Sequence, residues 1–209
     1  MQKAPKQVLI SQIKSIPVRV MLLAIVFLCS ISACESSYLP KPYGYNKIIL
    51  PQFTYQSLGD SLPYKFEVNT LAIVNPDTGA LSENYWLDID YPDFDASIQI
   101  TYKPLFNRQK ELQEYLRDAF NLTSKHQVRA YAIEESIIQT PHNKTGVIAE
   151  LSGEVPTPFQ FFSTDSSYHF LRAALYFNTA TKNDSLAPVI DYLKKDMIHM
   201  LNTLEWKNE

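Results

Sequence analysis

The chain has 209 residues, of which 45% are hydrophobic and 20% charged, and its 19 basic and 22 acidic residues give a net charge of −3. An acidic chain is a poor binder of nucleic acid, so we expect no nucleic-acid partner. With only five glycines and no Gly-rich loop, phosphate-binding and dinucleotide-binding motifs are also excluded.

The first segment in chain order combines a basic leader with an apolar run. Its basic residues are Lys3, Lys6, Lys14 and Arg19. The apolar run spans 20–31, and no acidic residue precedes Glu35. These features are typical of an export signal. A transmembrane helix is the alternative, but it needs roughly 20 apolar residues, and polar Ser30 and Ser32 interrupt this run.

The apolar run closes on Ile31-Ser32-Ala33-Cys34, which resembles a lipobox. We therefore predict a signal peptide over 1–33, cleavage between Ala33 and Cys34, and lipidation of Cys34 by acyl chains such as palmitate. Two or more acyl chains hold a protein durably to a bilayer, whereas one holds it only marginally. An ordinary secretory signal with a coincidental cysteine is the alternative.

Processing changes the balance of the chain. Loss of the leader removes four of the 19 basic residues and none of the 22 acidic ones, which leaves a net charge of −7. Cys29 leaves with the signal and Cys34 carries the lipid, so no thiol remains for a disulfide, a metal site or a nucleophile. No polybasic patch remains to bind anionic lipid, and we expect the covalent lipid to be the only attached group.

Residues 34–63 are interpreted as an extended tether. Proline favours extended backbone, and this segment contains Pro40, Pro42, Pro51 and Pro63. Tyr43, Tyr45 and Lys47 form a candidate partner contact, because tyrosine and cationic side chains are frequent in binding hot spots. The alternative is that these three residues pin the tether onto the domain's own sheet.

Residues 64–209 are predicted to form a single α+β domain. Alternation of apolar and polar residues predicts strands at 64–69, 85–91 and 97–102. Further strands are predicted at 128–139, 145–154, 159–163 and 168–178. Turn residues at 76–79 and 91–93 favour antiparallel hairpins. The strand 168–178 is apolar on both faces, so we expect it at the centre of the sheet.

Two helices complete the predicted domain. Apolar residues at spacings of three and four predict a helix over 107–122. A second helix is expected near the C-terminus, with Ser185 as its N-cap and Pro188 in its first turn. An antiparallel sheet sandwiched by helices follows from this order, and the pattern is similar to the Mog1/PsbP-like fold.

Polar residues outside these patterns define no catalytic or metal site. The acidic residues Asp88, Asp90, Asp93 and Asp95 lack the glycine and the distal glutamate of a calcium loop, so a solvated strand face and a turn are favoured. No metal-binding spacing relates His126, His142, His169 and His199. We interpret His169 as structural, and we expect Arg172, in an apolar strand, to pair with a buried carboxylate or to face a partner.

Four stretches together resemble one protein family. They are Leu-Pro-Lys-Pro-Tyr-Gly-Tyr-Asn-Lys-Ile-Ile-Leu-Pro at 39–51, Pro-Tyr-Lys-Phe-Glu at 63–67, Thr-Pro-Phe-Gln-Phe-Phe-Ser-Thr-Asp-Ser at 157–166, and His-Phe-Leu-Arg-Ala-Ala-Leu-Tyr-Phe at 169–177. The chain resembles the GldD family of gliding motility lipoproteins over essentially its whole processed length.

The resemblance implies a non-enzymatic, membrane-anchored envelope lipoprotein that faces the periplasm or the cell surface. It would serve gliding motility and type IX secretion by stabilising or assembling a partner, either another gliding lipoprotein or a membrane protein. The resemblance also makes Ser61 and Ser185 candidates for O-glycosylation, because each follows an aspartate and precedes a leucine. It carries no catalytic residue.

Two other functions are compatible with the residues. A pocket on the sheet with Asp88, Asp90 and His169 as its polar groups would bind a small ligand or hydrolyse a substrate. A general envelope-stabilising domain without a role in motility would differ only in phenotype.

Overall fold

The computed structural model describes residues 18–20, 48–58, 61–178 and 183–207. The predicted cleavage site at Ala33, the lipidation residue Cys34 and the contact candidates Tyr43, Tyr45 and Lys47 lie outside these ranges. The chain divides into two compact units, Met1–Gly44 and Tyr45–Glu209, and the fold described below is that of the second.

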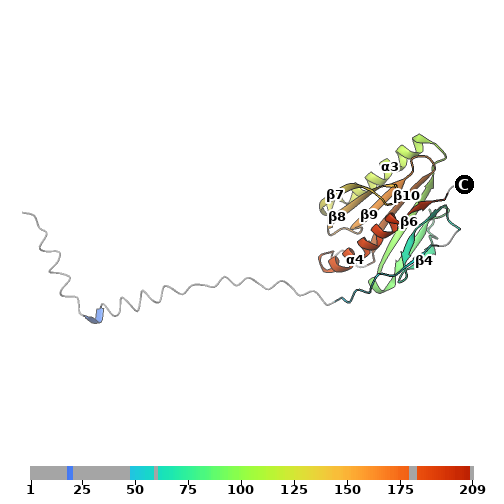
Figure 1. Cartoon of the computed structure of the whole chain (residues 1–209). Helices are drawn as coiled ribbons and strands as arrows, with labels where there is room; N and C mark the ends of the chain where they lie inside the picture. The colour runs from blue at the N-terminus through green and yellow to red at the C-terminus, as the bar shows by residue number, and fades with distance from the viewer. Residues whose placement is uncertain (1–17, 21–47, 59–60, 179–182, 208–209) are drawn as a thin grey trace, which may run out of the picture. The chain divides into compact units, whose positions relative to one another are not determined.

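A seven-stranded antiparallel sheet forms the centre of the second unit, in the order β4-β5-β6-β10-β9-β8-β7 (Figure 1). Its strands are β4 Ile73–Pro76, β5 Leu87–Tyr91, β6 Ala96–Pro104, β7 Ala130–Gln139, β8 Thr145–Gly153, β9 Phe159–Thr164 and β10 His169–Phe177. The strand β10, apolar on both faces, is the fourth of the seven, which confirms its predicted central place.

Two helices cover opposite faces of this sheet (Figure 1). They are α3 Gln109–Ser124 and α4 Asn183–Asn202, and two 3₁₀ turns, η1 Pro92–Phe94 and η2 Lys125–Val128, lie in the connections. No helix in the described parts of the chain is long and apolar enough to cross a membrane. The predicted α+β class, with an antiparallel sheet between helices, is confirmed.

Alternation along the strands assigns side chains to the two faces. In β10, Leu171 packs in the core under α4, whereas its neighbour Phe170 packs with Leu112 of α3. The larger core lies on the α4 face, where β6 places Ile98, Ile100 and Tyr102 opposite Leu175, Ala173 and Leu171 of β10. Burial of this continuous apolar layer is the main stabilising contribution to the fold.

Two short strand pairs lie outside the main sheet. The predicted strand 64–69 is in fact two strands, β2 Tyr64–Lys65 and β3 Glu67–Asn69. They pair antiparallel with β11 Glu205–Trp206 and β1 Tyr55–Ser57, respectively. The chain changes partner at Phe66, which is buried in the core. The strand β1 lies within the segment interpreted as a tether, so the last part of that segment packs on the domain.

Both helices begin at positions different from those predicted. Phe106 and Asn107 have φ angles of 49° and 61°, a left-handed conformation that a helix cannot contain, so α3 begins only at Gln109. At α4, the side-chain amide of Asn183 donates hydrogen bonds to the carbonyls of Gly153 (2.6 Å) and Val155 (3.0 Å). Ser185 therefore lies inside the first turn of α4 and is not its N-cap.

Candidate functional site

A cleft of about 1010 Å³ opens where β6 ends and β10 begins. Three aromatic side chains line it and remain about half exposed, namely Tyr85 (47%), Phe106 (55%) and Tyr168 (51%). Tyr102 and His169, both buried, also line the cleft. The cleft thus lies between the loop before β5, the end of β6 and the turn between β9 and β10.

His169 is fixed by contacts on two sides. Its ring stacks on that of Trp206 in β11, with centroids 5.0 Å apart and planes 3° apart. Its Nδ1 atom lies 2.9 Å from the hydroxyl of Tyr102. These contacts agree with the structural role predicted for this histidine.

The turn between β9 and β10 is organised by Asp165. Its Oδ1 atom accepts hydrogen bonds from the backbone N–H groups of Ser167 (3.0 Å), Tyr168 (2.8 Å) and His169 (2.8 Å). Burial acts to raise the pKa of Asp165, but these three hydrogen bonds stabilise the carboxylate and hold the pKa below its usual value. Asp165 is therefore an ionised acceptor at neutral pH.

Backbone strain is concentrated around this cleft. Of the six non-glycine residues with positive φ in the described chain, four lie at or beside it: Tyr85, Phe106, Asn107 and Ser166. The carbonyl of Tyr85 accepts a 2.6 Å hydrogen bond from the hydroxyl of Tyr64, and the backbone N–H of Asn107 donates a 2.6 Å bond to the carbonyl of Ser167. Such left-handed conformations cluster at functional sites, where the surrounding structure holds them in place.

The predicted pocket that gathers Asp88, Asp90 and His169 does not form. His169 and the core of β10 face α4, whereas Asp88 and Asp90 alternate with buried residues of β5 and point to the opposite face. There, Asp90 accepts a 3.1 Å hydrogen bond from the side chain of Asn75. Partial burial, followed by the charges of Asp77 and Asp90, raises the pKa of Asp88.

The acidic and histidine residues do not assemble into a metal centre. Asp93 lies in η1, and Asp95 ends it in a left-handed conformation, so the four aspartates do not surround one point. Within the described ranges, no group of three or more His, Cys, Asp or Glu residues is placed to hold a metal ion.

A buried polar cluster beneath α4 was not predicted from the sequence. The carboxyl of Asp196 is fully buried, and its Oδ2 atom accepts a 2.5 Å hydrogen bond from the hydroxyl of Tyr91. Nearby, the amide of Asn69 donates a 3.1 Å bond to the hydroxyl of Tyr192. The sequence did contain an indication of this cluster. Asp196 follows Leu193 by three residues, which places an acidic residue on the apolar stripe of α4.

Burial controls the acidity of this cluster. It raises the pKa of Asp196, although hydrogen bonds from Tyr91, Asn69 and Tyr55 act in the opposite direction. Burial, followed by the charge of Asp196, also raises the pKa values of Tyr55 and Tyr91. The cluster joins strands β1, β3 and β5 to α4 through these side chains.

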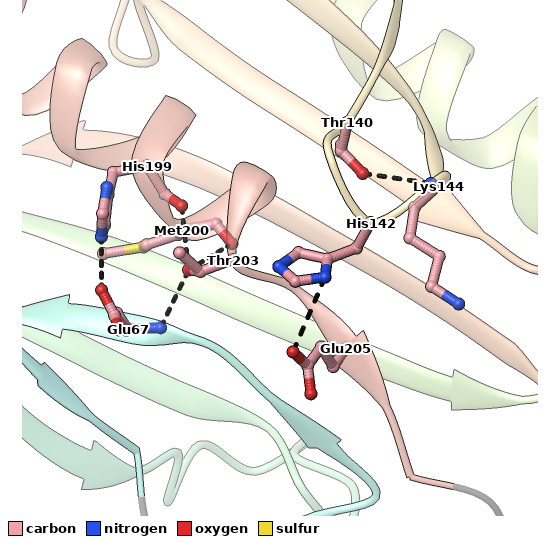
Figure 2. Close-up of polar contacts among 8 residues, drawn as sticks. All are labelled: Glu67, Thr140, His142, Lys144, His199, Met200, Thr203 and Glu205. Atoms are coloured by element: carbon pink, nitrogen blue, oxygen red, sulfur yellow. Dashed lines mark hydrogen bonds and ion pairs between the residues drawn. The ribbon is translucent and has the colours of Figure 1, made fainter.

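Two histidine–glutamate contacts lie at the C-terminal end of α4 (Figure 2). The Nε2 atom of His199 lies 2.7 Å from Oε2 of Glu67 in β3, whose backbone N–H donates a 3.0 Å bond to the hydroxyl of Thr203. His142, in the turn between β7 and β8, lies 3.7 Å from Glu205 of β11. The histidines thus bind separate carboxylates and tie neighbouring elements together.

Arg172 does not pair with a buried carboxylate, so that prediction was wrong. Its guanidinium donates to the side-chain oxygen of Gln160 in the neighbouring strand β9 and also contacts the hydroxyl of Tyr176. No carboxylate of the described residues lies within ion-pair distance of it. In the sheet register Arg172 lies opposite Phe162, and Gln160, two residues before Phe162, is its diagonal neighbour on the same face of the sheet.

The two candidate glycosylation residues are both exposed. Ser61 lies in the turn before β2, and Ser185 lies in the first turn of α4. Their positions allow access by a modifying enzyme, and their modification stays a prediction.

The family model for the gliding motility lipoprotein GldD matches residues 35–206. The chain belongs to the GldD family of gliding motility lipoproteins. The match to GldD starts one residue after Cys34 and ends in β11, so it includes both helices and every strand described above. The resemblance found in the sequence is therefore confirmed.

No curated protein matches the chain. The solution structure of cyanobacterial PsbP (CyanoP) from Synechocystis sp. PCC 6803 is similar, with a TM-score of 0.45 and 10% sequence identity over 77% of this chain and 97% of that chain.

Proposed function

We propose that this member of the GldD family is a lipid-anchored component of the gliding motility and type IX secretion machinery. It acts without catalysis and stabilises or assembles a partner, either another gliding lipoprotein or a membrane protein. The observation that carries the proposal is the family match over 35–206, which covers the processed chain from the residue after Cys34 to β11.

In this proposal Cys34 holds the protein to the cell envelope, with the domain facing the periplasm or the cell surface. The lipobox supports the anchor, because its cysteine is the acceptor of the acyl chains. Tyr43, Tyr45 and Lys47 follow the anchor and remain candidates for contact with the partner.

An exposed apolar surface supports protein docking. Val128 of η2 and Tyr131 and Ile137 of β7 are 94%, 81% and 78% exposed. β7 is the outermost strand, and its outer edge pairs with no other strand in the described residues. A ten-residue open edge with exposed apolar side chains is the kind of surface that a partner protein covers.

Deletion and complementation test this proposal. We expect deletion to lower the steady-state level of a partner lipoprotein and to stop gliding, and a wild-type copy to restore both. Ile137→Asp should restore them poorly, because it places a charge on the proposed docking strand. Ile73→Asp, at an exposed position on the opposite edge strand β4, is the matched control and should complement fully.

Crosslinking of the tagged protein in envelope fractions would identify the partner. A normal level of every envelope lipoprotein in the deletion strain would contradict the stabilising role. Equal failure of the two aspartate variants would contradict the placement of the docking surface on β7.

A further inference from the structure

The cleft beside His169 has the size and the fixed walls of a ligand site. Its volume of about 1010 Å³ lies at the upper end of the range for small-molecule sites, roughly 300–1,000 Å³. The hydroxyl of Tyr168 accepts a 2.8 Å hydrogen bond from Asn107, and Tyr64 holds the backbone at Tyr85. Walls that are already ordered reduce the entropy that a ligand must lose on binding.

The polar lining of the cleft is rich in hydrogen-bond acceptors. Glu83 and Asp165 contribute carboxylates, and Lys103 orients Glu83 through an ion pair. No Lys or Arg is among the described residues that line the cleft, and the two cations beside it are already engaged, Lys103 with Glu83 and Arg108 with the ring of Phe106, so the lining does not favour an anionic ligand. Ionised carboxylates accept hydrogen bonds and cannot donate them, so the complementary ligand is neutral or cationic and rich in donors.

The aromatic lining requires a ligand with apolar faces. Tyr85, Phe106 and Tyr168 are each about half exposed around the opening. The face of an aromatic ring is electron-rich and attracts weakly positive C–H groups. A sugar ring carries C–H groups on its faces and hydroxyl donors around its edge, whereas a proline-rich peptide offers mainly carbonyl acceptors.

We propose that this cleft binds a neutral oligosaccharide, with sugar faces against Phe106 and Tyr168 and sugar hydroxyls bonded to Glu83 and Asp165. Such a site adds glycan recognition to a protein whose proposed function is partner binding. It involves no bond cleavage, and it lies apart from the exposed strand β7.

Titration calorimetry on the processed chain, residues 34–209, tests the proposal. The probes are maltotetraose, mannotetraose and tetra-N-acetylchitotetraose. We expect at least one to bind with a Kd below about 1 mM. Binding should shift the NMR signal of the Trp206 indole, because Trp206 stacks on His169 next to the cleft. The chitotetraose stands for cell-wall glycan and the other two for surface polysaccharides, so the preferred probe separates these sources.

Two changes at Tyr168 separate its ring from its hydroxyl. Tyr168→Ala should weaken binding at least about tenfold, because a stacking surface is lost. Tyr168→Phe keeps the ring, loses only the Asn107 hydrogen bond, and should change the affinity less than about threefold. Tyr131→Ala removes an equally large exposed aromatic from β7, outside the cleft lining, and should leave binding unchanged.

If Tyr168→Ala unfolds the turn, Phe106→Asn provides the second variant, because asparagine tolerates the positive φ at this position. Absence of binding to all three probes overturns the proposal. Equal loss in Tyr131→Ala also overturns it, since the contact would then be unspecific. A synthetic peptide of residues 38–47, which contains prolines and lysines, is titrated in parallel; Tyr168-dependent binding of this peptide alone would identify a peptide site instead.

Discussion

Tyr55 stacks on His199, with ring centroids 3.6 Å apart and planes inclined by 14°. The same histidine contacts Glu67 through its Nε2 atom, and Tyr192, seven residues earlier in α4, stacks on Phe53 with centroids 4.4 Å apart. Residues 53–57 therefore pack against α4 and pair with β3. These contacts form a joint between the domain and the segment that leads to the predicted anchor.

Truncation of Tyr55 should weaken this joint. Tyr55→Ala removes the ring that stacks on His199, and we expect the free energy of unfolding to fall by about 1–2 kcal/mol. Urea unfolding measures the change. Gln56→Ala, on the exposed side of the same strand, is the control and should change stability by less than about 0.5 kcal/mol.

Asp196 should make the free energy of unfolding depend on pH. Burial raises its pKa in the folded state, so the folded protein holds the proton more tightly than the unfolded chain does. Its contribution is fully present below about pH 4 and is lost as the pH rises through the folded-state pKa. Asp196→Asn cannot ionise, so its stability relative to wild type should be more favourable at pH 7.5 than at pH 3.5.

Unfolding curves of both proteins at the two pH values measure this difference, and the comparison at equal pH cancels the titration of other groups. Tyr91→Phe, which removes the donor to Asp196, should cost about 1–3 kcal/mol at pH 7.5. A stability difference between wild type and Asp196→Asn that does not vary with pH would refute a raised pKa for Asp196.

Gly146 of β8 marks a close approach between the sheet and α4. A Cβ atom at this position would lie 2.9 Å from Cδ2 of buried Leu201. We expect Gly146→Ala to destabilise the fold by about 1–3 kcal/mol. In a Leu201→Ala background the same change should cost much less, because space has been made for it. Equal costs in the two backgrounds would show that the strain arises elsewhere.

The lipobox predicts the fate of a Cys34→Ala variant. Without the thiol no acyl chain is attached, so the protein should lose its association with membranes. Fractionation of cells into soluble and membrane parts measures the effect. Ser36→Ala, two residues further along, should behave like wild type. Membrane association that persists in Cys34→Ala and resists carbonate extraction would indicate a helical anchor.

Alternating sequences allowed most of the main sheet to be predicted. The predicted strands at 97–102, 145–154 and 159–163 lie within two residues of the ends of β6, β8 and β9. The short strands β1, β4 and β11 were not predicted. Strands of two to four residues are too short to show a period, and their extended shape depends on pairing with another strand, which for β11 is β2, far away in sequence.

The cleft was predictable only in part. His169 was predicted to be structural, and it lines the cleft. Asp88 and Asp90 lie on the opposite face of the sheet, because side chains alternate between the two faces along β5 and the buried face is taken by its apolar residues. The strained positions Tyr85 and Phe106 have no local signature, since neither is Gly, Asn or Asp. Only the tertiary fold brings the loop before β5 next to the turn at Tyr168.

The three-residue pairing of β1 with β3 also has a mechanical meaning. If Cys34 carries the acyl anchor, a pull between the membrane and the domain is borne by the packing of Leu50 and Phe53 and then by the pairs from Tyr55–Asn69 to Ser57–Glu67. So short a ladder yields at a much lower force than the nine-residue pairing of β6 with β10. Under load the pairing of β1 with β3 would then open first and lengthen the tether, while the seven-stranded sheet stays folded.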